Sequence, residues 1–464
     1  MNLKSLIIIL SLFIVGCSST QVEKEKLVTV QEEKEYLEKY GPTLSLEETL
    51  KIARERNLDL KIKELEREIA TLDKKIAFGN FLPSITLGGS YTRLDDDINI
   101  EMGLDLGPLG AAMHLPSSIE TKLIDESFYT TGVAAQIPIF VPSTWYLYSA
   151  RQKGEDISKL AESLADKMLQ LQVMSQYFYI LALESEKETL INSLKSSQEL
   201  EKKVETSLKV EGVLEWELKK VQALVESQEI ALNKNQRDLR IAKMNLKKTL
   251  NLNLQEDIKI EKIESIEVVL PTLDECIYKA LNGNEILQMR EKGQEINEDL
   301  KKIAITNFLP KIVLGGGYIN NSNHTLADPD FLFGNVSGVI SVFNGFKNVN
   351  EYKKAVRREK IGELTLEKEF MTTVLEVTKA YENVKTAQEM WNMAKLNYEA
   401  ETGKLNQRMV ERKVEMIGDE EFYKALAEYN EALSLKEKVQ YQYELALGAL
   451  SIAMGENPVR GGER

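Results

Sequence analysis

The chain repeats the stretch Asn80-Phe81-Leu82-Pro83-Ser84-Ile85-Thr86-Leu87-Gly88-Gly89-Ser90-Tyr91 as Asn307-Phe308-Leu309-Pro310-Lys311-Ile312-Val313-Leu314-Gly315-Gly316-Gly317-Tyr318. The two segments align without gaps at an offset of 227 residues, and nine of their twelve positions are identical. At the same offset Ser45-x-x-Glu48 falls on Thr272-x-x-Glu275, and each predicts a capping box that opens a helix. A match of this length indicates one architectural unit used twice.

A second pair of matched segments sets the boundaries of the two units. The alternating positions from Val133 to Ile139 correspond to those from Val336 to Val342, now at an offset of 203 residues. Because the offset falls from 227 to 203, the first unit carries 24 extra residues between its matched segments. Repeat 1 is therefore expected to span about 44–270 and repeat 2 about 271–458, with a short tail at 459–464.

Each repeat is predicted to contain a helix, two strands and two very long helices. In the first strand apolar or small residues from Ile85 to Tyr91 alternate with polar or small ones, which is the period of a β-strand. The predicted strands cover about 84–92, 128–140, 311–320 and 334–343. The segments near 92–127 and 320–333 are expected to be loops. Taken alone, these strands favour a half-buried soluble sheet over a membrane barrel, although both fit the alternation.

The helical segments favour the membrane barrel instead. Apolar residues recur every three or four positions without a helix-breaking proline over about 143–207, 214–252, 348–410 and 419–456. A helix of about 60 residues is roughly 90 Å long, which no globular core can bury, so these helices must pack as coiled coils. Four strands cannot close a barrel alone and an open edge is forbidden in lipid. The sequence thus predicts an oligomer if the strands lie in a membrane.

The N-terminus predicts a lipoprotein. Residues 1–16 have the charged start and the apolar run of a signal peptide, and the run is too short to cross a bilayer as a helix. Ile14-Val15-Gly16-Cys17 resembles a bacterial lipobox, so Cys17 is predicted to carry covalent acyl chains such as palmitate, followed by an extension at 17–43. The alternative is a generic signal peptide with an incidental cysteine. The other cysteine, Cys276, is interpreted as a small structural residue.

Composition excludes several classes of function. The formal net charge is −14, so neither nucleic acid nor an anionic membrane face is an expected partner. The only histidines, His114 and His324, lie far apart in predicted loops, and no phosphate-binding loop or nucleophile elbow occurs. We therefore expect no enzyme activity, no metal site and no cofactor other than the lipid.

The combined pattern resembles the TolC-like outer membrane factor family over nearly all of 44–458. The resemblance rests on Leu46-Glu47-Glu48 through Asn57, on Phe81-Leu82-Pro83, and on their second copies ending in Phe308-Leu309-Pro310. Tyr177 and Tyr381 resemble the tyrosine that the family places in its long helices, and Leu447-Gly448-Ala449-Leu450 resembles its closing helix.

The resemblance implies a mixed α and β fold in a homotrimer. Each chain would give four strands to a shared transmembrane β-barrel of 12 strands, continued by a long α-helical coiled-coil barrel across the periplasm. Such an outer-membrane exit duct serves efflux or secretion, docks onto a periplasmic adaptor protein, and takes its energy from an inner-membrane transporter of RND, ABC or MFS type. A competing hypothesis is a periplasmic coiled-coil structural or adaptor lipoprotein without a pore.

Two sets of residues are candidates for specific roles. Pro83 and Pro310 are predicted at the helix–strand junctions, since a fixed φ and a missing N–H end a helix. The family closes its tunnel with acidic side chains at the periplasmic tip, and the tips here are predicted near 210–213 and 412–421. The second tip holds Asp419, Glu420 and Glu421, which could form a ring of carboxylates in a trimer. Equally, Asp419 and Glu420 could only stabilise the N-terminus of the following helix.

Overall fold

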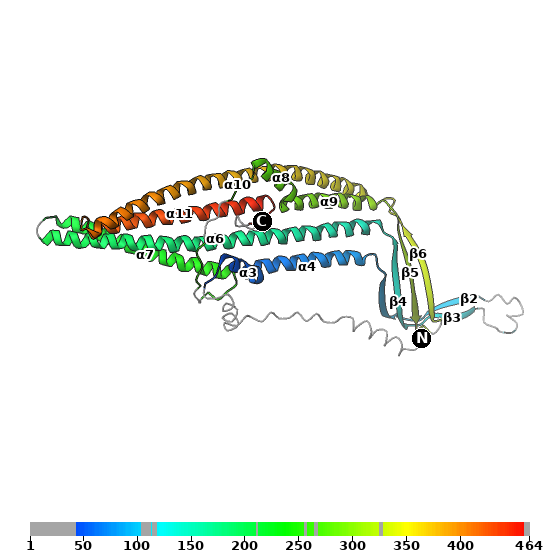
Figure 1. Cartoon of the computed structure of the whole chain (residues 1–464). Coiled ribbons are helices and arrows are strands. Elements are labelled where there is room, and N and C mark those ends of the chain that lie inside the picture. The colour runs from blue at the N-terminus through cyan, green and yellow to red at the C-terminus, as the bar shows by residue number, and fades with distance from the viewer. Residues whose placement is uncertain are drawn as a thin grey trace.

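The computed structural model describes residues 43–103, 113, 118–209, 212–254, 258–263, 268–323 and 328–458. These residues form an elongated molecule with long helices over most of its length and strands at one end (Figure 1). The longest helix has 68 residues, which corresponds to roughly 100 Å. The mixed α and β fold class predicted from the sequence is confirmed.

The first half of the chain contains four helices and four strands. Its elements are α3 (Leu46–Arg56), α4 (Leu58–Gly79), β1 (Ser84–Arg93), β2 (Ile98–Gly103), β3 (Ser118–Ile124), β4 (Ser127–Phe140), α6 (Pro142–Lys209) and α7 (Glu215–Thr249). The predicted capping box is present, because the Ser45 hydroxyl accepts from the Glu48 N–H and the Glu48 carboxylate accepts from the Ser45 N–H. The segment near 92–127, expected to be a loop, contains the antiparallel hairpin β2–β3.

The second half has the same order of elements without that hairpin. Its elements are α8 (Leu273–Gly283), α9 (Glu285–Thr306), β5 (Lys311–Asn321), β6 (Asp330–Val339), α10 (Lys347–Lys413) and α11 (Asp419–Ala453). Thr272 and Glu275 again form a capping box. In both halves the single helix expected before the strand is two helices, separated at Asn57 and at Asn284.

The strands β1, β4, β5 and β6 form one antiparallel sheet in that order. The last strand was predicted at 334–343, and this is wrong: β6 ends at Val339, so Ile340 and Val342 lie beyond it. The reason is that Val339 pairs with Lys311, the first residue of β5. Pro310 precedes it and has no N–H to continue the ladder.

The helices form a layer that continues the sheet. Their packed neighbours near the strands are α4 with α6, α6 with α9, and α9 with α10, and α3 and α8 pack on α6 and α10 at mid-length. Farther from the strands α7 packs on α6, α6 on α11 and α11 on α10. The buried hydrophobic side chains form two clusters at mid-length, one in each half.

Candidate functional site

The register of the four-stranded sheet gathers apolar side chains on one face. Leu87 pairs with Val133, Val133 with Tyr318, and Tyr318 with Leu332. Since paired residues point to the same side of a sheet, alternate positions of all four strands share this face. They include Ile85, Leu87, Tyr91, Tyr129, Val133, Ile137, Leu314, Tyr318, Leu332 and Val336.

This apolar face is bare in the single chain. Leu87 is 64% exposed and Val336 is 71% exposed. Helices lie beyond one end of the sheet, and among the described elements none covers its face (Figure 1). The only charged residues in the four strands are Arg93, Lys311 and Asp330, each at a strand end. An exposed apolar face without charge is typical of a surface that contacts lipid.

Aromatic side chains lie near both ends of this sheet. Near the helices, Trp145 contacts Phe140 with ring centroids 5.7 Å apart, and Phe343 and Phe346 contact each other at 5.4 Å. Near the opposite end the rings of Tyr91 and Tyr129 are 5.0 Å apart. Two aromatic bands that flank an apolar band are the pattern of strands crossing a bilayer.

The other face of the sheet is polar and small. Thr86 and Ala134 share it with Gly317 and Asn335. A Cβ added at Gly317 would lie 2.4 Å from the Val133 carbonyl oxygen, so the close backbone approach there requires glycine. A face of Ser, Thr, Gly and Asn suits a water-filled interior.

The two prolines lie where the helix gives way to the strand in each half. Pro83 lies between the end of α4 at Gly79 and the start of β1, and Pro310 lies between the end of α9 and the start of β5. The two junctions have the same local geometry, because Asn80 and Asn307 are both helical C-caps in the αR conformation. Each junction turns the chain from the helical layer into the sheet.

The acidic candidates at the second tip all have partners within the chain. Asp419 Oδ1 lies 2.7 Å from Arg412 Nη2, and Glu420 Oε2 lies 2.8 Å from Lys203 Nζ of α6. Glu421 accepts the Gly418 N–H at 3.1 Å, as an N-terminal capping residue of α11. The structure therefore brings these carboxylates to the end of the hairpin and gives Glu421 a capping contact. The partners Arg412 and Lys203 pull the tip of α11 toward α10 and α6.

The other parts of the tips differ in what surrounds them. The Arg412 guanidinium lies 4.1 Å from the centroid of the Phe422 ring, a cation–π contact that holds the turn. Val414 and Met416 in the same turn are 60% and 75% exposed. At the first tip Gly212 and Val213 are described, and Val210 and Glu211 lie outside the described residues.

Two asparagines fix the mid-length region, a role that the sequence did not reveal. The Asn57 amide oxygen accepts the Leu60 N–H and caps α4, while its Nδ2 donates to the Thr249 carbonyl at the end of α7 at 2.8 Å. Asn284 does the same in the second half, capping α9 and donating to the Ala453 carbonyl at 3.0 Å. The recurrence of Asn57 at Asn284 was the only available signal.

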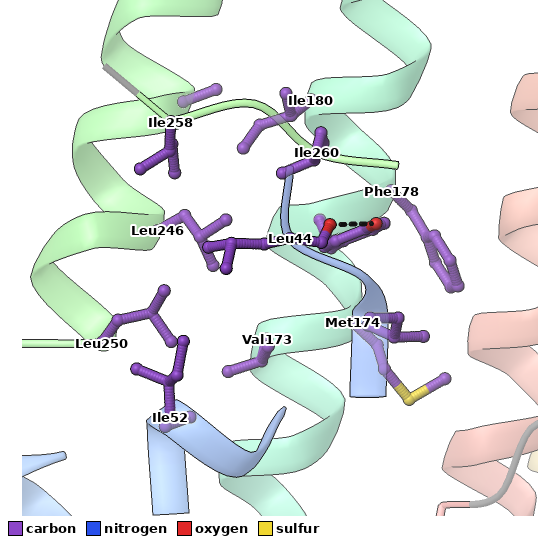
Figure 2. Close-up of a cluster of buried hydrophobic side chains, with 14 of the residues drawn as sticks. Leu44, Ile52, Val173, Met174, Phe178, Ile180, Leu246, Leu250, Ile258 and Ile260 are labelled. Carbon is purple, nitrogen blue, oxygen red and sulfur yellow. Dashed lines mark hydrogen bonds between the residues drawn. The ribbon is translucent and has the colours of Figure 1, made fainter. Parts of the chain in front are cut away.

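Tyr177 ties three segments together in the buried cluster of the first half. Its hydroxyl lies 3.0 Å from the Leu44 carbonyl oxygen and 2.7 Å from the Glu261 carbonyl oxygen, and the side chain is fully buried. Leu44 forms a parallel bridge with Ile260, and both insert beside α6 (Figure 2). Tyr381 is the buried counterpart in the second half.

The remaining candidates concern the cysteines, histidines and metal. Cys17, His114 and His324 lie outside the described residues. Cys276 is fully buried among apolar side chains, and this burial raises the pKa of its thiol, as suits a structural residue. Among the described residues no group of three or more His, Cys, Asp or Glu side chains could hold a metal ion. No helix in that part of the chain is long and apolar enough to span a membrane.

Comparison with solved structures identifies the fold. The sequence matches no family model and no curated protein. The outer membrane channel CmeC of Campylobacter jejuni has a TM-score of 0.71 at 15% identity, covering 97% of this chain and 92% of CmeC. The MtrE outer membrane channel of Neisseria gonorrhoeae, in its open state, has a TM-score of 0.68 at 18% identity, covering 90% and 91%.

The chain has the outer-membrane channel fold. A third structure with this channel fold, the outer membrane protein VceC of Vibrio cholerae, has a TM-score of 0.68 at 12% identity, with 93% of this chain and all of VceC covered. The fold that the TolC-like resemblance implied is therefore confirmed. In the channel fold the strand sheet and the hairpin tips are the two ends of the elongated molecule (Figure 1).

Proposed function

We propose that this chain is a subunit of a homotrimeric exit duct in the outer membrane, anchored through lipid on Cys17. Three copies would each give four strands to a closed barrel of 12. The helices would continue the barrel as a tunnel, and the two similar halves would descend from one duplicated unit. The duct would pass efflux or secretion substrates, dock onto a periplasmic adaptor protein, and take energy from an inner-membrane transporter of RND, ABC or MFS type.

One observation carries this proposal: the sheet has a bare apolar face and two open edges. Within the described residues β1 and β6 each have a neighbour on one side only. An open strand edge cannot remain in lipid, because its backbone groups would lack hydrogen-bond partners. Pairing β1 of one copy with β6 of the next closes the sheet into a barrel. The channel fold of CmeC and MtrE supports the same reading.

The test is single-particle imaging of the full chain extracted from outer membranes in detergent. We expect a three-fold particle more than 100 Å long, with a detergent belt around the strand end. A monomer or dimer without such a belt would contradict the duct and favour the coiled-coil lipoprotein. Thiol labelling gives an independent check, because a cysteine at Leu87 or Leu314 should resist an aqueous reagent, whereas one at Thr86 should react.

A further inference from the structure

One seam between helices joins the two halves of the chain by buried ion pairs. Lys153 of α6 has its Nζ 2.6 Å from Asp299 Oδ2 and 3.7 Å from Glu295 Oε2 of α9. Two turns further on, Lys167 pairs with Glu285, and both side chains are buried. The register of α9 on α6 is therefore set by lysines on one helix and carboxylates on the other.

The two halves correspond residue by residue across these helices. The offset of 227 relates α4 to α9, and an offset of 204 brings Tyr177 of α6 onto Tyr381 of α10. Under these two offsets the Lys74–Glu155 ion pair maps onto Lys301–Glu359, which is also an ion pair. Burial agrees as well: Val173 and Ile180 map onto Val377 and Val384, and all four are buried. The correspondence therefore holds in three dimensions.

The same correspondence shows which faces are bare. Near the strands the helices lie in the order α4, α6, α9, α10, so α4 and α10 are the open edges of the layer. Glu285 and Asp299 of α9 are 4% and 2% exposed, whereas their counterparts in α4, Leu58 and Leu72, are 52% and 54% exposed. The contact that covers α9 has no equivalent on α4 within the chain.

The edge helix α10 has the complementary bare face. Lys167 of α6 is 7% exposed and its counterpart Met371 is 65% exposed. Apolar residues follow this edge at Ile361, Leu364, Met371 and Leu375, all exposed. On α4 the exposed apolar residues are Leu58, Ile62, Leu65, Ile69, Leu72 and Ile76, spaced alternately by four and three positions. Such spacing is the stripe of a helix that packs on another helix.

We propose that α4 of one copy packs on α10 of the next copy in the register that α9 keeps on α6 within the chain. Leu58 then contacts Met371 of the next copy, as Glu285 contacts Lys167. Glu68 then faces Arg357 of the next copy, as Glu295 faces Lys153, so the opposite charges are kept. This inference rests on the proposed closed ring of copies and specifies its interface.

The sheet edges support the same partner. Since α4 leads into β1 and β6 leads into α10, the open strand and the open helix lie on the same side at each edge. A second copy that pairs its β6 with β1 therefore brings its α10 beside α4. The seam within the chain is ionic and the seam between copies is mainly apolar, as suits a permanent contact between subunits.

The inference is tested by cross-linking in the intact outer membrane. The full chain carries Leu58→Cys and Met371→Cys, and a short bifunctional maleimide bridges the two thiols, because the equivalent pair meets through a long lysine side chain. We expect covalent dimers and trimers on denaturing gels and no larger species. The control pair Leu58→Cys and Leu396→Cys should give none. Leu396 is as exposed as Met371 but lies seven turns farther along α10.

The mass of the detergent-extracted particle separates the two ways of failing. A trimer that gives no cross-link through Met371, or an equal one through Leu396, overturns the register and leaves the duct standing. A monomer overturns both. As a second measurement, Glu68→Arg should lower the cross-linking yield several-fold, and adding Arg357→Glu should restore it. Failure of the double reversal to restore the yield would also overturn the register.

Discussion

At the scale of single residues, the two asparagines that cap α4 and α9 have measurable contributions. Asn57→Ala removes the cap on Leu60 and leaves the Thr249 carbonyl without its donor, so the free energy of unfolding should fall by about 1–3 kcal/mol. Asn57→Ser keeps a capping oxygen but is too short to reach Thr249, and should lose less. Denaturant melts of the detergent-extracted protein measure both. Equal losses in the two variants would mean that only the contact with Thr249 matters.

The buried tyrosine gives a second prediction at this scale. Tyr177→Phe removes the hydroxyl that joins α6 to the Leu44 and Glu261 carbonyls, and should lower stability by about 1 kcal/mol. Tyr179→Phe is the matched control, since Tyr179 is half exposed on the same helix. The thermal midpoint, followed by circular dichroism, should fall for the first variant only. A fall of the same size for Tyr179→Phe would show that the carbonyl contacts are not the cause.

At the scale of elements, the α4–α6 seam predicts a pH dependence. The hydrogen bond from Lys74 lowers the pKa of the buried Glu155 carboxyl below its usual value. Its folded-state pKa is depressed, so its contribution to stability is complete at neutral pH and is lost as the pH falls below about 4. Glu155→Gln should therefore show a smaller loss of thermal midpoint between pH 7 and pH 3.5 than the unchanged chain.

A matched carboxylate provides the control for that measurement. Glu363 forms an ion pair with Lys360 on the exposed side of α10, where solvent screens the charges. Glu363→Gln should leave the pH profile of the thermal midpoint almost unchanged. If both variants flatten the profile equally, the dependence comes from total charge and not from the α4–α6 seam.

The two faces of the sheet predict opposite responses to charge. Leu87→Lys places an ammonium group on the apolar face and should cost about 2–4 kcal/mol if that face contacts lipid. Thr86→Lys places the same group one residue away on the polar face, where it should be tolerated. The amount of assembled protein in outer-membrane fractions distinguishes them. Loss of assembly in both variants, or in Thr86→Lys alone, would contradict the assignment of the faces.

At the scale of the whole molecule, the carboxylates at the tip of α11 predict the behaviour of the closed tunnel. Neutralising Asp419, Glu420 and Glu421 together removes the contacts with Arg412 and Lys203 and the charge ring of the assembled tip. We expect leak of a bulky antibiotic to rise several-fold. Unchanged permeability would leave helix capping as the role of these residues.

A single lysine separates two explanations of that leak. Lys203→Met breaks the contact with Glu420 but keeps all three carboxylates. If the ring of charge controls passage, this variant should leak less than the triple variant. Equal leak in both would assign the effect to the contact between α6 and α11.

The sequence by itself determined much of the architecture, because the signals were local. The duplicated stretch around Pro83 and Pro310, the period-two strands and the two capping boxes each depend on residues that lie close together in the chain. Such patterns fix the kind, order and approximate bounds of the elements. The hairpin β2–β3 was missed, because its short strands lie within an acidic segment that reads as a loop.

Contacts between distant segments were decided by the tertiary structure alone. Asn57 meets Thr249, Lys153 meets Asp299 and Glu420 meets Lys203 across about 150 to 220 residues, and no spacing rule relates them. The end of β6 at Val339 likewise depends on where its partner β5 begins. Local propensity fixes what each segment is, whereas the order of packing fixes which helix faces are covered. Only the folded chain therefore shows that α4 and α10 remain open.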